Sequence, residues 1–181
     1  MEHGEQHLVV RDGSPSGPGS PSDGDGKNLR PFQETDTAFF TDLATDERVT
    51  RYVGDGRPWA PQLIQERLRT ALQQMPVEQA GAVRWFIAEE AGEAIGLVVS
   101  TRWETGVEVG YWVSPEHWGR GVAGAMIDLA AATVPEIYGR ARLIARVDPA
   151  NAASARVLTR RGFGLEANHD GLDHYVLVQT Q

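Results

Sequence analysis

The chain has 181 residues, a formal net charge of −8 at pH 7 and no cysteine. The lack of cysteine excludes disulfides, cysteine-bound zinc and a thiol nucleophile, and an acidic chain without a basic stripe is a poor partner for nucleic acid or an anionic membrane. No apolar stretch is long enough for a membrane-spanning helix, and the first residues lack the features of a secretory signal, so we expect a cytoplasmic protein.

The first part of the chain, residues 1–28, is rich in glycine, serine, proline and aspartate from position 11 onward. Such a segment buries too little apolar surface to offset the entropy lost on ordering. We therefore predict a flexible segment over residues 1–28, with residues 7–10 as a stray strand, and one folded domain over residues 29–181.

From residue 29 the hydrophobic pattern predicts regular elements. A strand at 29–32 precedes two short helices within 36–53 and an amphipathic helix at 60–75. Strands follow at 83–90, 94–101 and 107–113, then a helix at 122–138, a strand at 141–147, a helix at 151–162 and a strand at 173–180. This βαα–βββ–α–β–α–β order predicts an α+β domain with a mixed sheet.

A glycine-rich turn separates the strand at 107–113 from the next helix, and Gly119, Gly121 and Gly124 spell G-x-G-x-x-G. Free amides at a helix N-terminus bind anions, and glycine allows the backbone to approach a phosphate closely. The alternative is a tight turn whose glycines only permit packing. The same pattern is the dinucleotide fingerprint, and Asp148 follows the next strand. However, hairpin strands precede the turn, and too little chain follows it for a second mononucleotide-binding half.

Two segments together carry a family resemblance: residues 108–127, EVGYWVSPEHWGRGVAGAMI, and residues 147–163, VDPANAASARVLTRRGF. They resemble the GNAT superfamily of acyl-CoA-dependent N-acetyltransferases, and most of all its Rim-type branch, over residues 29–180. The resemblance implies a mostly antiparallel sheet with helices on both faces, and acetyl transfer from acetyl-CoA to a primary amine without a metal. It also implies that the turn cradles the coenzyme A pyrophosphate through Trp118, Gly119, Arg120, Gly121, Val122, Ala123 and Gly124, although Trp118 departs from the usual glutamine or arginine.

The resemblance further implies two roles on the strand before the turn. The backbone N–H of Val113 is expected to bind the thioester oxygen where negative charge develops, at a place where the strand splays from its neighbour and where Gly110 marks a bulge or a close approach. Glu108 is expected to take the proton of the amine. The alternative for Glu108 is a salt-bridged strand residue.

Two further roles fall on the helix at 151–162. Asn151 is expected to bind the pantetheine arm as well as to cap the helix. Many members of the family carry a tyrosine where this chain has Leu158, so the resemblance assigns the donor to the leaving thiolate to Ser154. The alternative is that the Ser154 hydroxyl only bonds back to a helical carbonyl.

The acceptor is left open among a protein N-terminus, an amino acid, a polyamine and an aminoglycoside-like antibiotic. Four tryptophans belong either to the core or to the wall of an acceptor pocket: Trp59, Trp85, Trp103 and Trp112. Three acidic residues are candidates to attract a cationic amine: Asp55, Glu104 and Asp170. Candidates for the adenosine 3′-phosphate are Arg140, Arg142, Arg160 and Arg161. The five histidines show no metal-ligand spacing, and a homodimer is an expectation because dimers are frequent in the family. Two alternatives remain: an acyl-CoA-binding module without catalysis, and an NAD-dependent oxidoreductase.

Overall fold

The computed structural model describes residues 26–139 and 141–177. The first strand begins at Lys27, so the folded domain starts slightly earlier than the sequence predicts. The expected strand at 7–10 and the expected phosphate contact of Arg140 lie outside the described residues.

In the part of the chain that the structure describes, seven strands form one sheet in the order β1-β2-β3-β4-β5-β7-β6. Their bounds are β1 Lys27–Pro31, β2 Val83–Glu90, β3 Glu93–Trp103, β4 Gly106–Val113, β5 Leu143–Val147, β6 Gly164–His169 and β7 Leu172–Leu177. Within the described residues only β4 and β5 pair in parallel, and every other neighbouring pair is antiparallel. The predicted mixed sheet is therefore confirmed.

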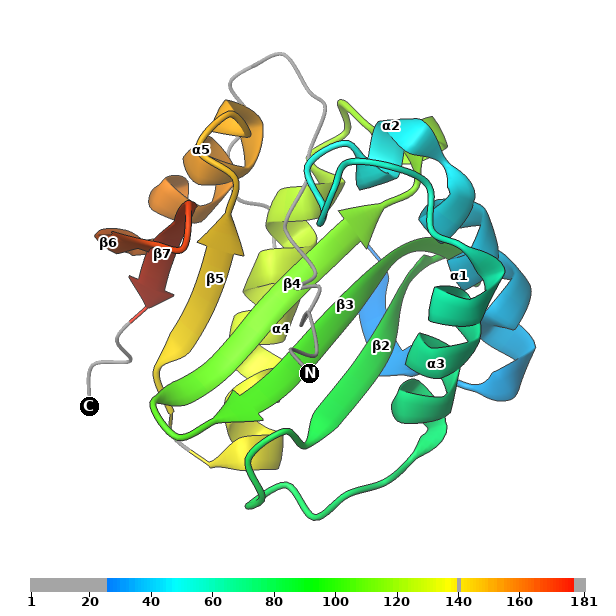
Figure 1. Ribbon diagram of the computed structural model, residues 1–181, viewed down its shortest axis with the longest axis horizontal. Coiled ribbons are helices and arrows are strands. Elements are labelled where there is room, and N and C mark those ends of the chain that lie inside the picture. The colour runs from blue at the N-terminus through cyan, green and yellow to red at the C-terminus, as the bar shows by residue number, and fades with distance from the viewer. Residues whose placement is uncertain (1–25, 140, 178–181) are drawn as a thin grey trace.

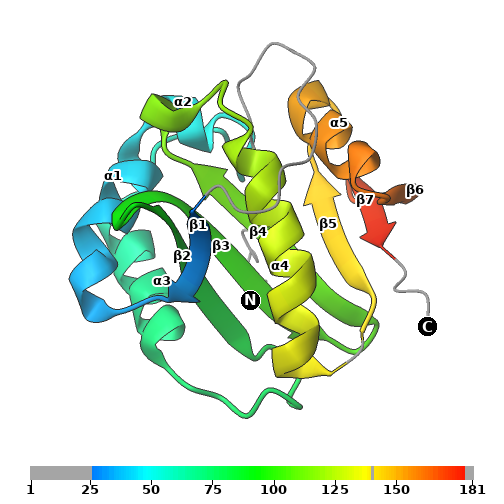
Figure 2. The same cartoon turned by 180° about the vertical axis from the view of Figure 1, so that it is seen from behind.

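Helices cover the sheet on both faces (Figures 1 and 2). Their bounds are α1 Thr37–Thr45, α2 Glu47–Thr50, α3 Pro61–Leu72, α4 Val122–Tyr138 and α5 Ala152–Arg160, with 3-10 turns at Glu34–Asp36 and Pro115–His117. The helices α1 to α3 lie on one face, and α4 crosses the other (Figure 2). On the face that carries α1 to α3, no helix covers β4, β5 and β7 (Figure 1).

Two hydrophobic clusters form the core, one on each face of the sheet. The cluster under α1 to α3 holds Trp59, Trp85 and Trp112, each at most 5% exposed. Trp59 meets Trp112 edge-on, and Phe40 meets Trp59 and Trp85 edge-on and stacks on Trp112. These three tryptophans are therefore core residues and do not line an acceptor pocket. Trp103 lies outside the cluster.

One strand was missed by the sequence analysis. The sequence predicts a single final strand, whereas the structure has the hairpin of β6 and β7. All six residues of β6 are exposed, so its sequence lacks the alternation of apolar and polar residues by which a half-buried strand is found.

Gly96 on β3 provides a test of the packing between the sheet and α4. A Cβ atom there would lie 2.6 Å from Sδ of Met126 and 2.7 Å from the backbone oxygen of Trp112. Because the backbone cannot yield as a side chain can, we expect Gly96→Ala to lower the free energy of unfolding by about 1–3 kcal/mol. Gly164→Ala is the matched control, since no atom lies within 4 Å of its Cβ position. Chemical denaturation that gives equal midpoints for the two variants would contradict this packing.

Candidate active site

The sheet opens in its middle, between β4 and β5. These strands pair only at Val107–Leu143 and Glu108–Ile144, although β4 continues to Val113 and β5 to Val147. Figure 1 shows the two strands diverging beyond that contact. The expected splay of the strand before the glycine turn is therefore present.

Val113 lies at the open end of β4. The N–H of Ser114 donates to the oxygen of Ile95 at 2.9 Å, and hydrogen-bonded and non-bonded pairs alternate in an antiparallel ladder. The next pair, Val113 with Gly96, is therefore a non-bonded one, and the polar groups of Val113 point away from β3. The carbonyl of Val113 accepts a 2.9 Å bond from Nε1 of Trp118, and its N–H faces the same opening.

Gly110 does not interrupt the strand. It pairs with Val99 in unbroken register, so the bulge expected at this glycine is absent from the pairing of β3 with β4. The register shift of this region lies instead between Ala88 and Glu89 on β2.

The glycine turn begins where β4 ends and leads into α4. Gly119 and Gly121 have φ values of 78° and 71°, which are left-handed conformations that favour glycine. No atom lies within 4 Å of a Cβ placed on Gly121, so packing does not explain that glycine. The backbone of the turn is thus free to bring the first amides of α4 close to an anion.

The third glycine of the motif has a different role. Nε of Arg161, just beyond α5, donates to the oxygen of Gly124 at 2.7 Å and lies 3.1 Å from Oδ1 of Asp128. A Cβ on Gly124 would stand 1.9 Å from Nη2 of Arg161. Both residues therefore take part in the contact between α4 and α5, and their expected contacts with the cofactor stay predictions.

Two other arginines also have acidic partners. Nη2 of Arg120, in the glycine turn, lies 3.0 Å from Oε2 of Glu90 on β2, and Arg142 pairs with Glu166 on β6. A phosphate role for either guanidinium would require it to exchange a carboxylate for the phosphate.

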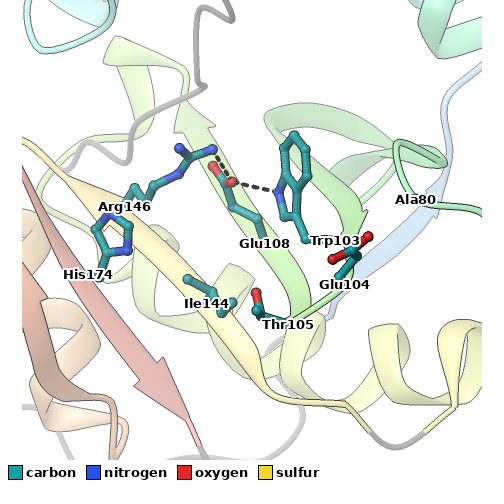
Figure 3. A pocket seen from close by; sticks show the side chains of 8 residues that line it. All are labelled: Ala80, Trp103, Glu104, Thr105, Glu108, Ile144, Arg146 and His174. Carbon is teal, nitrogen blue, oxygen red and sulfur yellow. Dashed lines mark hydrogen bonds and ion pairs between the residues drawn. The ribbon is translucent and has the colours of Figure 1, made fainter. Parts of the chain in front are cut away.

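A pocket of about 500 Å³ lies on the same face of the sheet as α1 to α3, in the part that these helices do not cover (Figure 3). It is lined by Ala80, Trp103, Glu104, Thr105, Glu108, Ile144, Arg146 and His174. The size is typical of a small-molecule site. Of the tryptophans expected to line an acceptor pocket, only Trp103 does so.

Glu108 is the polar centre of this pocket. Its Oε2 accepts a 2.9 Å bond from Nε1 of Trp103 and also pairs with Nη2 of Arg146. The Arg146 guanidinium lies 5.9 Å from the centre of the Trp103 ring. Glu108 is 7% exposed, and its salt bridge with Arg146 lies at the wall of the pocket. The predicted role of Glu108 in taking the proton of the amine stays a prediction.

Sequence reasoning missed Arg146 and His174. They face each other across the pairing of β5 with β7, which the sequence does not reveal. Arg146 gave one local signal, a charged residue inside an otherwise apolar strand, and His174 gave none.

The start of α5 lies beside the open end of β5 (Figure 1). Asn151 is 2% exposed and caps the helix, its Oδ1 accepting a 3.3 Å bond from the N–H of Ser154. Ser154 is fully buried, and Leu158 is a fully buried member of the core cluster against α4. The predicted cap is confirmed.

The dinucleotide interpretation is wrong. A doubly wound fold needs repeated parallel strands, and over residues 26–139 and 141–177 this sheet has one parallel pair. Oδ1 of Asp148 accepts a 2.8 Å bond from the N–H of Ala150, which places it in the turn before α5. Among the described residues no group of three side chains is arranged to hold a metal ion, and within the same residues no helix is long and apolar enough to cross a membrane.

The other acidic candidates are not gathered at the pocket. Asp55 accepts a bond from the N–H of Arg57, and Asp170 lies 2.8 Å from Nδ1 of His169 in the β6–β7 turn. Only Glu104 reaches the pocket, as an exposed residue of its rim.

Comparison with known proteins gives consistent matches. Residues 28–164 match the model of a family described as acetyltransferase (GNAT) domain. The uncharacterized N-acetyltransferase YoaA of Bacillus subtilis (strain 168) is 32% identical over 145 residues, which cover 76% of this chain and 79% of that protein.

Solved structures share the fold at low sequence identity. Spermidine N-acetyltransferase from Vibrio cholerae, in complex with CoA and spermine, has a TM-score of 0.69 at 20% identity, covering 84% of this chain and 94% of its own. Aminoglycoside acetyltransferase AAC(6′)-Ib, in complex with coenzyme A, has a TM-score of 0.68 at 16% identity, covering 84% and 95%.

The two glycines at the start of α4 are expected to respond differently to substitution. Gly121→Ala strains a positive φ and places a methyl group where the cofactor phosphate is predicted to bind, so we expect the Kd of acetyl-CoA to rise roughly tenfold, equivalent to about 1.4 kcal/mol. Gly124→Ala displaces Arg161, so we expect a lower melting temperature with an unchanged Kd. Calorimetric titration and thermal unfolding measure the two effects. A large loss of acetyl-CoA affinity in Gly124→Ala alone would contradict this assignment.

Proposed function

The chain belongs to the acetyltransferase (GNAT) domain family, and from that premise we propose that it acetylates the primary amine of a small molecule. As a member it is an acyl-CoA N-acyltransferase with acetyl-CoA as its co-substrate. One observation carries the proposal: the opening between β4 and β5 adjoins a pocket of about 500 Å³. That pocket suits an amine of small-molecule size, and structures of the same fold hold spermine or an aminoglycoside. The relatives named above do not support a placement in the Rim-type branch.

In the proposed complex the pyrophosphate lies on the amides from Gly119 to Ala123, where the dipole of the seventeen-residue helix α4 favours negative charge. Pantetheine runs from there into the opening. Its two amides face the backbone groups of β4 beyond Glu108, where β5 no longer pairs with β4. Asn151, buried at the start of α5, contributes its amide group to the other side of the arm. This arrangement leads the thioester toward the pocket.

The reaction needs a donor at the thioester oxygen and a donor at sulfur. The N–H of Val113 faces the opening and serves the oxygen, where a preorganised donor acts most strongly because the charge develops there. Ser154 serves the sulfur as the thiolate leaves. We assign Glu108 to holding Arg146 and Trp103 in place around the amine.

Thiol release from acetyl-CoA tests the proposal directly. The purified protein is mixed with acetyl-CoA and, separately, with spermine, kanamycin and a short peptide with a free N-terminus, and free thiol is measured. We expect release to depend on a small amine. Thiol release with the peptide alone would contradict a small-molecule acceptor and indicate a protein N-terminus instead. Binding of acetyl-CoA without thiol release for any amine would favour a non-catalytic acyl-CoA-binding module.

Ser154 provides a test of the leaving-group role. Ser154→Ala removes one hydroxyl, so we expect kcat to fall by about 10–100-fold, less than the range typical of a fully engaged general acid, with the KM for acetyl-CoA nearly unchanged. Thr159→Ala is the matched control, since its hydroxyl bonds to the oxygen of Ala155 on the exposed side of the same helix. If both variants keep the wild-type kcat, the serine has only a structural role.

A further inference from the structure

Four titratable side chains line the pocket: Glu104, Glu108, Arg146 and His174. The guanidinium of Arg146 donates hydrogen bonds and accepts none. Glu104 is exposed at the rim of the pocket. The Glu108 carboxylate already accepts hydrogen bonds from Trp103 and Arg146. We propose that His174 on β7 is the group that accepts the proton of the acceptor amine. This inference rests on the acetyl transfer proposed above and names the base that the reaction needs.

The position of His174 follows from strand pairing. His174 lies directly opposite Arg146 in the register of β7 with β5, and directly paired residues point to the same face of a sheet. On β5, Ile144 is the last residue that pairs with β4, and Arg146 lies beyond it. His174 therefore stands beside the opening, and Figure 3 shows its ring next to Arg146, with Glu108 and Trp103 farther along the pocket.

The surroundings keep the imidazole neutral. Burial lowers the pKa of His174 most, and the charges of Arg146 on β5 and His169 on β6 lower it further. Glu108 on β4 and Asp170 in the β6–β7 turn oppose the shift. Because the pKa falls below its usual value of 6.5, the ring remains an unprotonated acceptor at neutral pH and becomes protonated only in more acidic solution.

The step balances without any further reactant. The ammonium group gives one proton to a ring nitrogen of His174, directly or through a water molecule, and leaves a neutral amine and an imidazolium. The nitrogen lone pair attacks the thioester carbon, the C–N bond forms and the C–S bond breaks. The second nitrogen proton passes to the departing sulfur, so the products are the amide and the coenzyme A thiol. The imidazolium then returns its proton to solvent.

The test is the pH dependence of kcat for the most active amine of the panel, spermine, kanamycin or peptide. In the wild type, kcat is expected to be level above pH about 6.5 and to fall below it. In His174→Gln, kcat at pH 7 is expected to be lower, up to the 10²–10⁴-fold typical of general-base loss. It should climb steadily to pH 9, because the free amine then forms in water. His169→Gln, with an exposed ring 5.9 Å from that of His174, is the matched control. It should keep the wild-type kcat at pH 7 and the level region above it, and its acidic fall should move only slightly to higher pH, because one of the charges that lower the pKa of His174 is removed.

The outcomes separate this inference from the proposed function. If the wild type releases no thiol with any amine, the proposed function fails before His174 is tested. If the wild type is active and His174→Gln keeps both the level of kcat and the shape of the wild-type profile, His174 is not the base. His174→Asn is measured in parallel in case the glutamine does not fit. Acetyl-CoA affinity equal to that of the wild type shows that each variant is folded.

Discussion

The short parallel contact between β4 and β5 is the constraint on which the site depends. A parallel pair needs a crossover connection, and here α4 supplies it, so the start of α4 must lie at the carboxyl end of β4. The strands pair at two positions and then separate. The separation leaves the N–H of Val113 beside the amides of the glycine turn, and it brings Arg146 and His174 to the edge of the same opening. One strand, β4, thus carries both the N–H proposed as the donor, that of Val113, and the Glu108 carboxylate.

The pocket is held together by a charge pair that stability alone does not explain. Burying Glu108 and Arg146 removes both from water, and the attraction between them does little more than offset that cost. Removing either one leaves the other uncompensated. The pair therefore has its main effect on geometry: it fixes the guanidinium against Trp103 and keeps the carboxylate occupied. A site organised in this way needs another group to receive a proton, and this is the place that His174 takes.

Local patterns predicted the long elements and the part of the site that is local in sequence. Gly121 and Asn151 were found because a helix start has its own residue preferences. The cross-strand relations were not predictable in that way, since the register that sets Arg146 opposite His174 depends on how β5 and β7 pair. The contact of Arg161 with Gly124 likewise joins residues far apart in the chain, so this packing role of the third glycine was not predicted. The exposed strand β6 escaped because no apolar alternation marks it.

Hydrogen exchange at single amides, followed by NMR with and without acetyl-CoA, tests the central claim that the cofactor fills the opening between β4 and β5. The account predicts that acetyl-CoA slows exchange at Val113 and at the amides from Gly119 to Ala123, and that NADH leaves these amides unchanged. Slower exchange at amides elsewhere with no effect at Val113, or protection of the glycine turn by NADH, would contradict it.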